Sequence, residues 1–191
     1  MRFSALAMSI VLTGCASGPP PRIFVLGTPA DPVPSVAMRD RRAVVRLPNV
    51  SLPDYLDTSD ILLRDGRNEL TSSRTGRWGE RLSVGITRDL AETLTGRLPD
   101  ILIAHSSLPG RPARDLLVDI ETFDIGPGAR CVLTARWTVL GEDRRTIDSA
   151  GRGTFVATAA DATDPAIVAA MTADVGQLAD RVAAALGRDA R

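Results

Sequence analysis

The sequence is poor in the residues from which catalytic and metal sites are usually built. Its 191 residues include one histidine, His105, and two cysteines, Cys15 and Cys131. A zinc site with the usual cysteine and histidine ligands cannot be assembled from this set, and no Gly-x-Ser-x-Gly motif is present to hold a hydrolase nucleophile. We therefore expect no metal, no cofactor and no catalytic site; a serine hydrolase that uses His105 is the enzymatic alternative.

An excess of charge of either sign is also missing. Lysine is absent, and 23 arginines balance 23 acidic residues, so the formal net charge is zero. Proteins that bind nucleic acid usually carry a surplus of basic residues. The composition therefore gives no indication of a nucleic-acid partner.

A long hydrophobic run is lacking, and the short one near the N-terminus is typical of a signal peptide. Arg2 precedes an apolar run over residues 5–12, well below the ~20 residues that span a bilayer. The run ends in the lipobox Leu12–Cys15, whose cysteine can accept lipid and become the first residue after cleavage. We predict a signal peptide at residues 1–14 and lipid attachment at Cys15, with a plain cleaved signal as the alternative.

The remaining chain divides into a stalk and one domain. Residues 15–21 are rich in proline and poor in apolar side chains, so we predict a lipidated stalk there. Several acyl chains on Cys15 would hold the protein at a membrane, since each buried methylene contributes ~0.8 kcal/mol. Residues 22–191 are enough for a single domain with its own core. We expect Cys131 to be a buried free thiol, with an intermolecular disulfide as the alternative.

Short apolar segments separated by glycine and proline predict a series of strands. We expect strands at residues 23–26, 42–50, 61–64, 68–71, 100–105, 114–124, 130–140 and 144–158. The last three follow one another through short turns and should form an antiparallel meander. In the first of these three, alternation places Leu116 on one face and Leu117 and Phe123 on the other.

Two amphipathic helices complete the predicted fold. From about Trp78 to Arg97, leucine and isoleucine recur at every fourth position and give a one-sided apolar stripe. The second helix is expected to have Asp164 as its N-cap, Pro165 at its first position and Gly187 as its stop. Because both stripes are one-sided, both helices should pack on a sheet. The predicted fold class is α/β, an α/β sandwich with a mixed sheet and two main helices.

The predicted loop at residues 52–57 contains a large apolar pair, Tyr55 and Leu56. Such a pair either folds back on the core or is covered by a partner, and the sequence leaves both alternatives open. Asp54, Asp57 and Asp60 have calcium-like spacing but lack the glycine and glutamate of an EF-hand loop. We interpret these carboxylates as a solvated turn.

Arginines are frequent in the segment that follows this loop. Guanidinium groups can bind lipid phosphates through two hydrogen bonds, but Asp65, Glu69 and Glu80 dilute the positive charge. A solvated face is therefore the preferred interpretation. The arginines concerned are Arg64, Arg67, Arg74, Arg77 and Arg81.

An ordered set of motifs resembles the PqiC-type ABC-transport auxiliary lipoproteins. It consists of Val44–Asp57, which ends in the pattern Leu-Pro-x-Tyr-Leu-Asp, then the strand Ile61–Arg64, then Arg77-Trp78 opening a helix. The resemblance covers the lipobox and about residues 22–105, while the meander and the last helix agree in layout. Residues 23–26 depart from the pattern, because such proteins often carry a tyrosine in the first strand.

The resemblance implies a fold similar to the TolB amino-terminal domain and a lipoprotein that faces the periplasm. It also implies work with an MCE-domain protein and a membrane permease that move lipid between two membranes. It supplies no catalytic residues. Ala16, the non-acidic residue after Cys15, is compatible with outer-membrane anchoring in similar lipoproteins, and the inner membrane is the alternative.

We therefore predict a non-enzymatic adaptor that docks the periplasmic end of an MCE tunnel to the outer membrane. A second copy of the chain is a further candidate partner. The alternative function is a periplasmic lipid-binding carrier with an apolar cavity. The candidate partner interface consists of Pro53, Tyr55, Leu56, Asp57, Arg64 and Trp78.

Overall fold

The computed structural model describes residues 20–27, 43–105 and 113–188. The predicted signal peptide, Cys15 and most of the stalk at residues 15–21 lie outside the described residues. In chain order the elements are β1 (Arg22–Phe24), β2 (Ala43–Arg46), β3 (Asp60–Arg64), β4 (Leu70–Trp78), α1 (Leu82–Arg97), β5 (Ile101–Ala104), β6 (Arg114–Gly126), the 3₁₀ turn η1 (Pro127–Ala129), β7 (Arg130–Leu140), β8 (Ile147–Thr158) and α2 (Asp164–Arg188).

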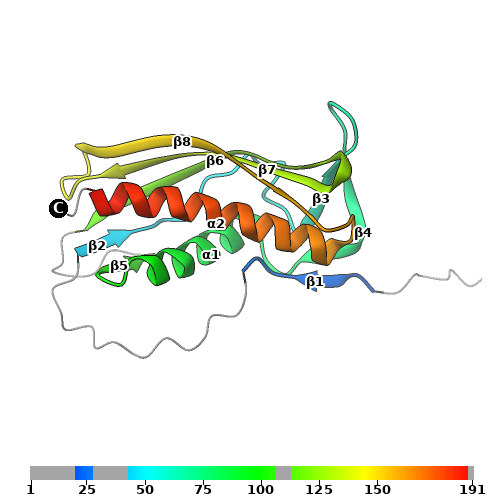
Figure 1. The fold of residues 1–191 in the computed structure, drawn as a ribbon, viewed down its shortest axis with the longest axis horizontal. Helices are drawn as coiled ribbons and strands as arrows, with labels where there is room; N and C mark the ends of the chain where they lie inside the picture. The colour runs from blue at the N-terminus through cyan, green and yellow to red at the C-terminus, as the bar shows by residue number, and fades with distance from the viewer. Residues whose placement is uncertain (1–19, 28–42, 106–112, 189–191) are drawn as a thin grey trace, which may run out of the picture.

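The strands form two sheets, and α1 and α2 lie side by side against the larger one (Figure 1). The five-stranded sheet has the order β5-β2-β6-β7-β8; β2 is parallel to β5 and β6, and β6, β7 and β8 form an antiparallel meander. The α/β class with mixed strands and two helices is thus confirmed. The expectation of one sheet is wrong, because β1 pairs with β4 and gives a separate sheet of order β1-β4-β3.

The apolar stripe of α1 is buried as predicted, but the helix begins later than expected. Leu82, Ile86, Leu90 and Leu94 are at most 4% exposed. Trp78 does not open the helix; it ends β4, where it pairs with Phe24 of β1 and its N–H donates to the Ser59 carbonyl at 2.8 Å. Strand pairing thus overrides the helical pattern up to Trp78.

The helix α2 is also buried along its predicted stripe, and its ends are shifted slightly. The carbonyl of Thr163 accepts the first helical hydrogen bond, from the Ile167 N–H at 3.0 Å. Asp164 therefore lies inside the first turn and is not the N-cap, and Gly187 lies within the helix and does not stop it. No described helix has both the length and the apolar character to cross a membrane.

A bulge in β6 changes which side chains face the core. The register against β7 shifts between Ile120 and Thr122, so Phe123 turns inward and is only 2% exposed. The prediction that Phe123 shares a face with Leu117 is therefore wrong, because Leu117 stays on the solvent side. Strict alternation holds only where the ladder has no extra residue.

Three of the buried titratable groups have raised pKa values. Cys131 on β7 is a buried free thiol, as predicted, and burial followed by the nearby charge of Asp174 raises its pKa to about 11. Burial raises the pKa of Asp174 on α2 to about 7 and that of Asp89 on α1 to about 6. One carboxylate oxygen of each aspartate has no hydrogen-bond partner among the described residues, which is consistent with a protonated acid.

These two acids should make stability depend on pH. Aspartate in an unfolded chain titrates near pH ~4, whereas the folded protein keeps these protons to higher pH. Both protonated acids should therefore contribute fully to the free energy of unfolding below pH ~4. It should fall as pH rises toward 7, by about 4 kcal/mol for Asp174. Urea unfolding from pH 4 to pH 8 measures this slope.

The variant Asp174→Asn tests the assignment, because asparagine has a similar shape and cannot ionise. We expect its unfolding free energy to vary less with pH than that of the wild type. Asp65→Asn, in the exposed β3–β4 turn, is the matched control and should keep the wild-type slope. Parallel curves for wild type and Asp174→Asn would contradict the prediction.

Candidate functional site

The predicted partner loop is a tight turn that separates its two apolar residues. The Leu56 N–H donates to the Pro53 carbonyl at 2.9 Å, and the Asp57 N–H donates to the Asp54 carbonyl at 3.3 Å. Leu56 is 3% exposed and belongs to the core, whereas Tyr55 is 44% exposed. Leu56 therefore folds back on the core, whereas Tyr55 faces solvent and is available to a partner.

Asp57 caps α1 from a separate segment of the chain. Its Oδ1 accepts a hydrogen bond from the Ser83 N–H at 3.0 Å, and its Oδ2 lies 2.6 Å from an Arg81 guanidinium nitrogen. Arg81, at the N-cap position, makes no side-chain cap of its own. Burial pushes the pKa of Asp57 upward, but the Ser83 hydrogen bonds and the Arg81 charge outweigh this effect and hold it below its ordinary value. Asp57 therefore fixes the turn to the start of the helix.

Arg64 links the same turn to the large sheet. Its guanidinium lies 2.7 Å from the Asp124 carboxylate on β6 and donates to the Arg67 carbonyl at 3.2 Å. The hydrogen bond to Asp124 raises the pKa of Arg64. Burial acts in the opposite direction, and the nearby Tyr55 hydroxyl adds to the increase. The side chains of Tyr55 and Arg64 therefore lie together at the β3 edge of the small sheet.

The other candidate interface residues are less accessible. Trp78 is 5% exposed and Leu56 is buried, so neither offers its side chain to a partner. Pro53 is half-buried. Among these residues, the side chain of Tyr55 is exposed, and those of Arg64 and Pro53 are partly accessible.

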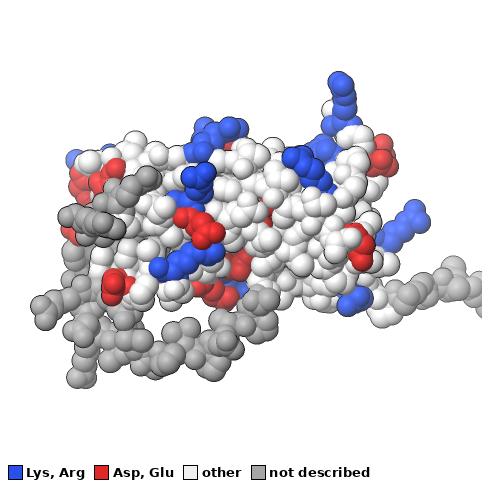
Figure 2. All heavy atoms as spheres, viewed as in Figure 1, with Lys and Arg blue, Asp and Glu red and all other residues white. Residues whose placement is uncertain are grey.

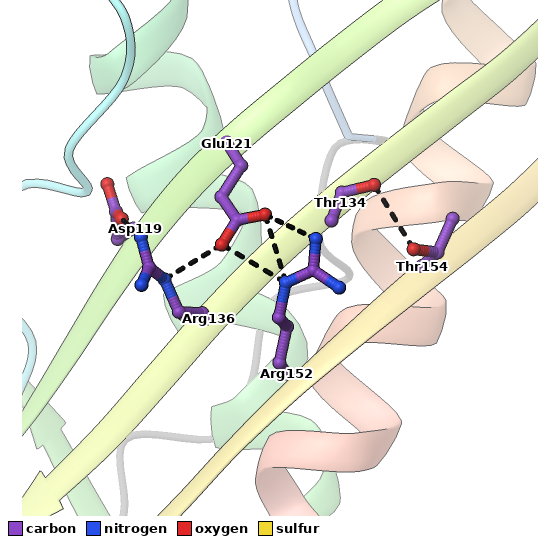
Figure 3. A network of polar contacts seen from close by, with 6 residues as sticks. All are labelled: Asp119, Glu121, Thr134, Arg136, Arg152 and Thr154. Carbon is purple, nitrogen blue, oxygen red and sulfur yellow. Dashed lines mark hydrogen bonds and ion pairs between the residues drawn. The ribbon is translucent and has the colours of Figure 1, made fainter.

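A polar network on the open face of the five-stranded sheet was not predicted (Figure 3). Glu121 on β6 lies 2.8 Å from Arg136 on β7 and 2.7 Å from Arg152 on β8, and Arg136 also reaches Asp119 at 3.3 Å. The hydrogen bond from Arg152, opposed by some burial, lowers the pKa of Glu121. The only signal in the sequence is alternation of charged and apolar residues. Exposed pairs of this kind contribute little stability, so the network marks a solvated face.

A groove of about 580 Å³ lies between β8 and the C-terminal half of α2. Trp137 and Phe155 line it, together with Arg152 of β8 and Gln177 and Arg181 of α2. Two glycines of β8 leave room for the rings, since a Cβ at Gly151 would lie 2.4 Å from Trp137 Cζ2 and one at Gly153 would lie 2.8 Å from Phe155 Cζ. The buried Trp137 Nε1 has no hydrogen-bond partner among the residues that the structure describes. The groove therefore combines aromatic surface with the charged side chains of Arg181 and Asp180, while the guanidinium of Arg152 is held by Glu121 on the open face of the sheet.

The residues weighed for catalysis do not come together in the described part of the chain. His105 is exposed just after β5, and no hydrogen bond joins it to another described residue. Among residues 20–27, 43–105 and 113–188, no three metal-binding side chains form a group that could hold an ion. Asp57 and Asp60 of the calcium-like spacing are engaged instead by Arg81 and, at 3.7 Å, by Arg77.

Comparison with known proteins places these features in a family and a fold. A family model described as "ABC-type transport auxiliary lipoprotein component" matches residues 24–183, and the comparison with curated proteins found no match. A solved structure of an uncharacterized protein has a TM-score of 0.73 and 13% identity, covering 87% of this chain and 98% of that one. Protein XCC0632 from Xanthomonas campestris has a TM-score of 0.66 and 13% identity, covering 89% and 96%. At these identities the solved structures show the fold alone.

The capping role of Asp57 predicts a measurable loss of stability in Asp57→Ala. We expect the free energy of unfolding to fall by about 1–2 kcal/mol, because the first turn of α1 loses a side-chain acceptor. Asp54→Ala is the matched control, since Asp54 is exposed in the same turn and should change stability by less than about 0.5 kcal/mol. Equal stability of the two variants in urea unfolding would show that Asp57 is not a cap.

Proposed function

The chain belongs to the family of ABC-type transport auxiliary lipoprotein components, and we propose that it is a non-enzymatic subunit of an MCE-type lipid transport system. In this proposal Cys15 carries the lipid anchor in the outer membrane. The domain faces the periplasm and holds the end of a tunnel formed by an MCE-domain protein, which works with a membrane permease. The family match extends the resemblance seen in the sequence through the meander and the last helix.

The observation that carries the docking role is the rigid presentation of Tyr55. A large aromatic side chain in an exposed turn commonly serves as an anchor in protein interfaces. Here the turn is held by burial of Leu56, by the Asp57 cap on α1 and by the Arg64–Asp124 ion pair. A partner would meet a turn that needs little ordering on binding, which favours affinity.

A second copy of the chain is a further partner compatible with this proposal. β8 is the last strand of the five-stranded sheet, and edge strands present backbone groups that can pair with another chain. The Tyr55 turn lies on the small sheet and not on β8, so the two contacts do not compete for the same residues.

Replacement of Tyr55 by alanine should weaken partner binding without unfolding the domain. We expect Tyr55→Ala to reduce co-purification of the MCE-domain protein from membranes at least about tenfold, the loss of one interface anchor of ~1.4 kcal/mol or more. Leu117→Ala is the matched control, because Leu117 is 43% exposed, close to the 44% of Tyr55, on the other sheet. Unchanged co-purification of Tyr55→Ala with an unchanged melting temperature would overturn the docking role.

The groove between β8 and α2 supports the alternative of a lipid-binding carrier. Its aromatic rings and the Arg181 guanidinium suit an amphiphile with an anionic head group, although the groove lies at the surface and not within the core. If the carrier function holds, native mass spectrometry of the protein from membranes should show bound phospholipid. We expect that signal to decrease in Arg181→Gln and to persist in Arg145→Gln, which alters an exposed arginine in the β7–β8 turn. Absence of lipid in all three samples would contradict the carrier.

A further inference from the structure

The most exposed apolar surface of the described chain lies on β1. Ile23 is 65% exposed and Val25 is 52% exposed. Ile23 lies in β1 and Val25 directly follows the strand, while Phe24 between them packs against the core. A Cβ at Gly79 would lie 3.0 Å from Ile23 Cγ2 and 3.3 Å from Val25 Cγ1, so both aliphatic chains rest over the backbone of this glycine.

Basic residues accompany this aliphatic pair. Arg22 of β1 and Arg74 and Arg77 of β4 are all exposed, and neither strand contains an acidic residue. Arg77 is the register partner of Ile23. Its nearest acidic group, Asp60 of β3, is 3.7 Å away. Figure 2 shows basic side chains projecting at this end of the molecule, where Figure 1 places β1 and β4. We call Ile23, Val25, Arg74 and Arg77 the β1 patch. Arg22 lies on the other side of the strand with Phe24, its guanidinium 5.2 Å from the centre of that ring.

The position of the β1 patch along the chain points to what covers it. Ile23 is eight residues after Cys15, and eight residues span about 30 Å at most when fully extended. If Cys15 is anchored as proposed above, the β1 patch can never be farther than this from the bilayer surface. A partner protein without such an anchor would not be held at this distance, and self-association of anchored copies is an outcome that the test below distinguishes.

We propose that the β1 patch is a lipid-contact surface that seats the domain against the membrane carrying its anchor. Ile23 and Val25 would enter the boundary between head groups and acyl chains. The arginines would bind lipid phosphates through charge-assisted hydrogen bonds while their methylene stems lie along apolar surface. The anchor then confines the domain, and the β1 patch sets its orientation.

Vesicle binding by the chain with Cys15→Ser, produced without residues 1–14, tests the patch with neither an acyl chain nor the apolar signal sequence. We expect this protein to co-sediment with vesicles of phosphatidylethanolamine and phosphatidylglycerol. The double change Ile23→Ser and Val25→Ser should weaken binding at least about tenfold. Ile147→Ser is the matched control, because Ile147 is 62% exposed on β8; it should bind like the parent protein.

A second pair of variants tests the phosphate contacts. Arg74→Gln combined with Arg77→Gln should reduce binding to the anionic vesicles and make it less sensitive to salt, because fewer charges are screened. Arg145→Gln should leave both the vesicle binding and its salt dependence unchanged. All of these residues are exposed, so melting temperatures should stay close to that of the parent protein.

The experiments distinguish an error in the lipid-contact proposal from an error in the proposed acylation of Cys15. No vesicle binding by the Cys15→Ser protein, or equal binding by the Ile23/Val25 variant, would overturn the lipid-contact surface. If sedimentation velocity shows that this variant instead loses self-association, the patch joins two copies and the proposal is likewise overturned. Intact mass of the membrane-purified wild type decides the acylation of Cys15 separately.

Discussion

Burial of one face of the five-stranded sheet beneath α1 and α2 is the constraint on which the rest of the structure depends. Each helix has one apolar stripe, and the residues of both stripes are almost completely buried. Because the helices occupy one face of the sheet, the opposite face takes the charged side chains, among them Glu121 and Arg152. The same packing encloses Asp89 and Asp174, which are held in a low-dielectric layer where ionisation is costly.

Local periodicity made most elements predictable. The four-residue spacing from Leu82 to Leu94 and the short turns of the β6-β7-β8 meander are properties of neighbouring residues, and the structure confirms both. Features that depend on distant parts of the chain were missed. Trp78 is a strand residue because it pairs with Phe24 of β1, and the bulge that turns Phe123 inward is set by pairing with β7.

The conformation of the candidate interface could be predicted only in part. The sequence singled out the turn at residues 53–57, yet it could not tell that Leu56 enters the core while Tyr55 faces solvent. Nor could it assign Asp57 as the cap of α1, because Ser83 is 26 residues away in the chain. Of the two large apolar residues in this turn, only Tyr55 is exposed. The likeness to the TolB domain and the role of each interface residue stay predictions.

The strand order of the small sheet relates the two proposed contacts. β1 and β3 are its two edges, with β4 between them, so the β1 patch and the Tyr55–Arg64 pair lie on opposite edges. Adjacent strands are ~4.8 Å apart, which separates the two edges by only about 10 Å. The two contacts are also offset along β4, because Ile23 is opposite Arg77 whereas Arg64 is opposite Leu70, and seven strand residues span ~20 Å. A partner held at Tyr55 would therefore be spaced from a bilayer contacted by β1. Force between membrane and partner would pass through this three-stranded sheet, which is joined to the large sheet by the Arg64–Asp124 ion pair and to α2 by the hydrogen bonds from Ser73 and Thr75 to Asp164.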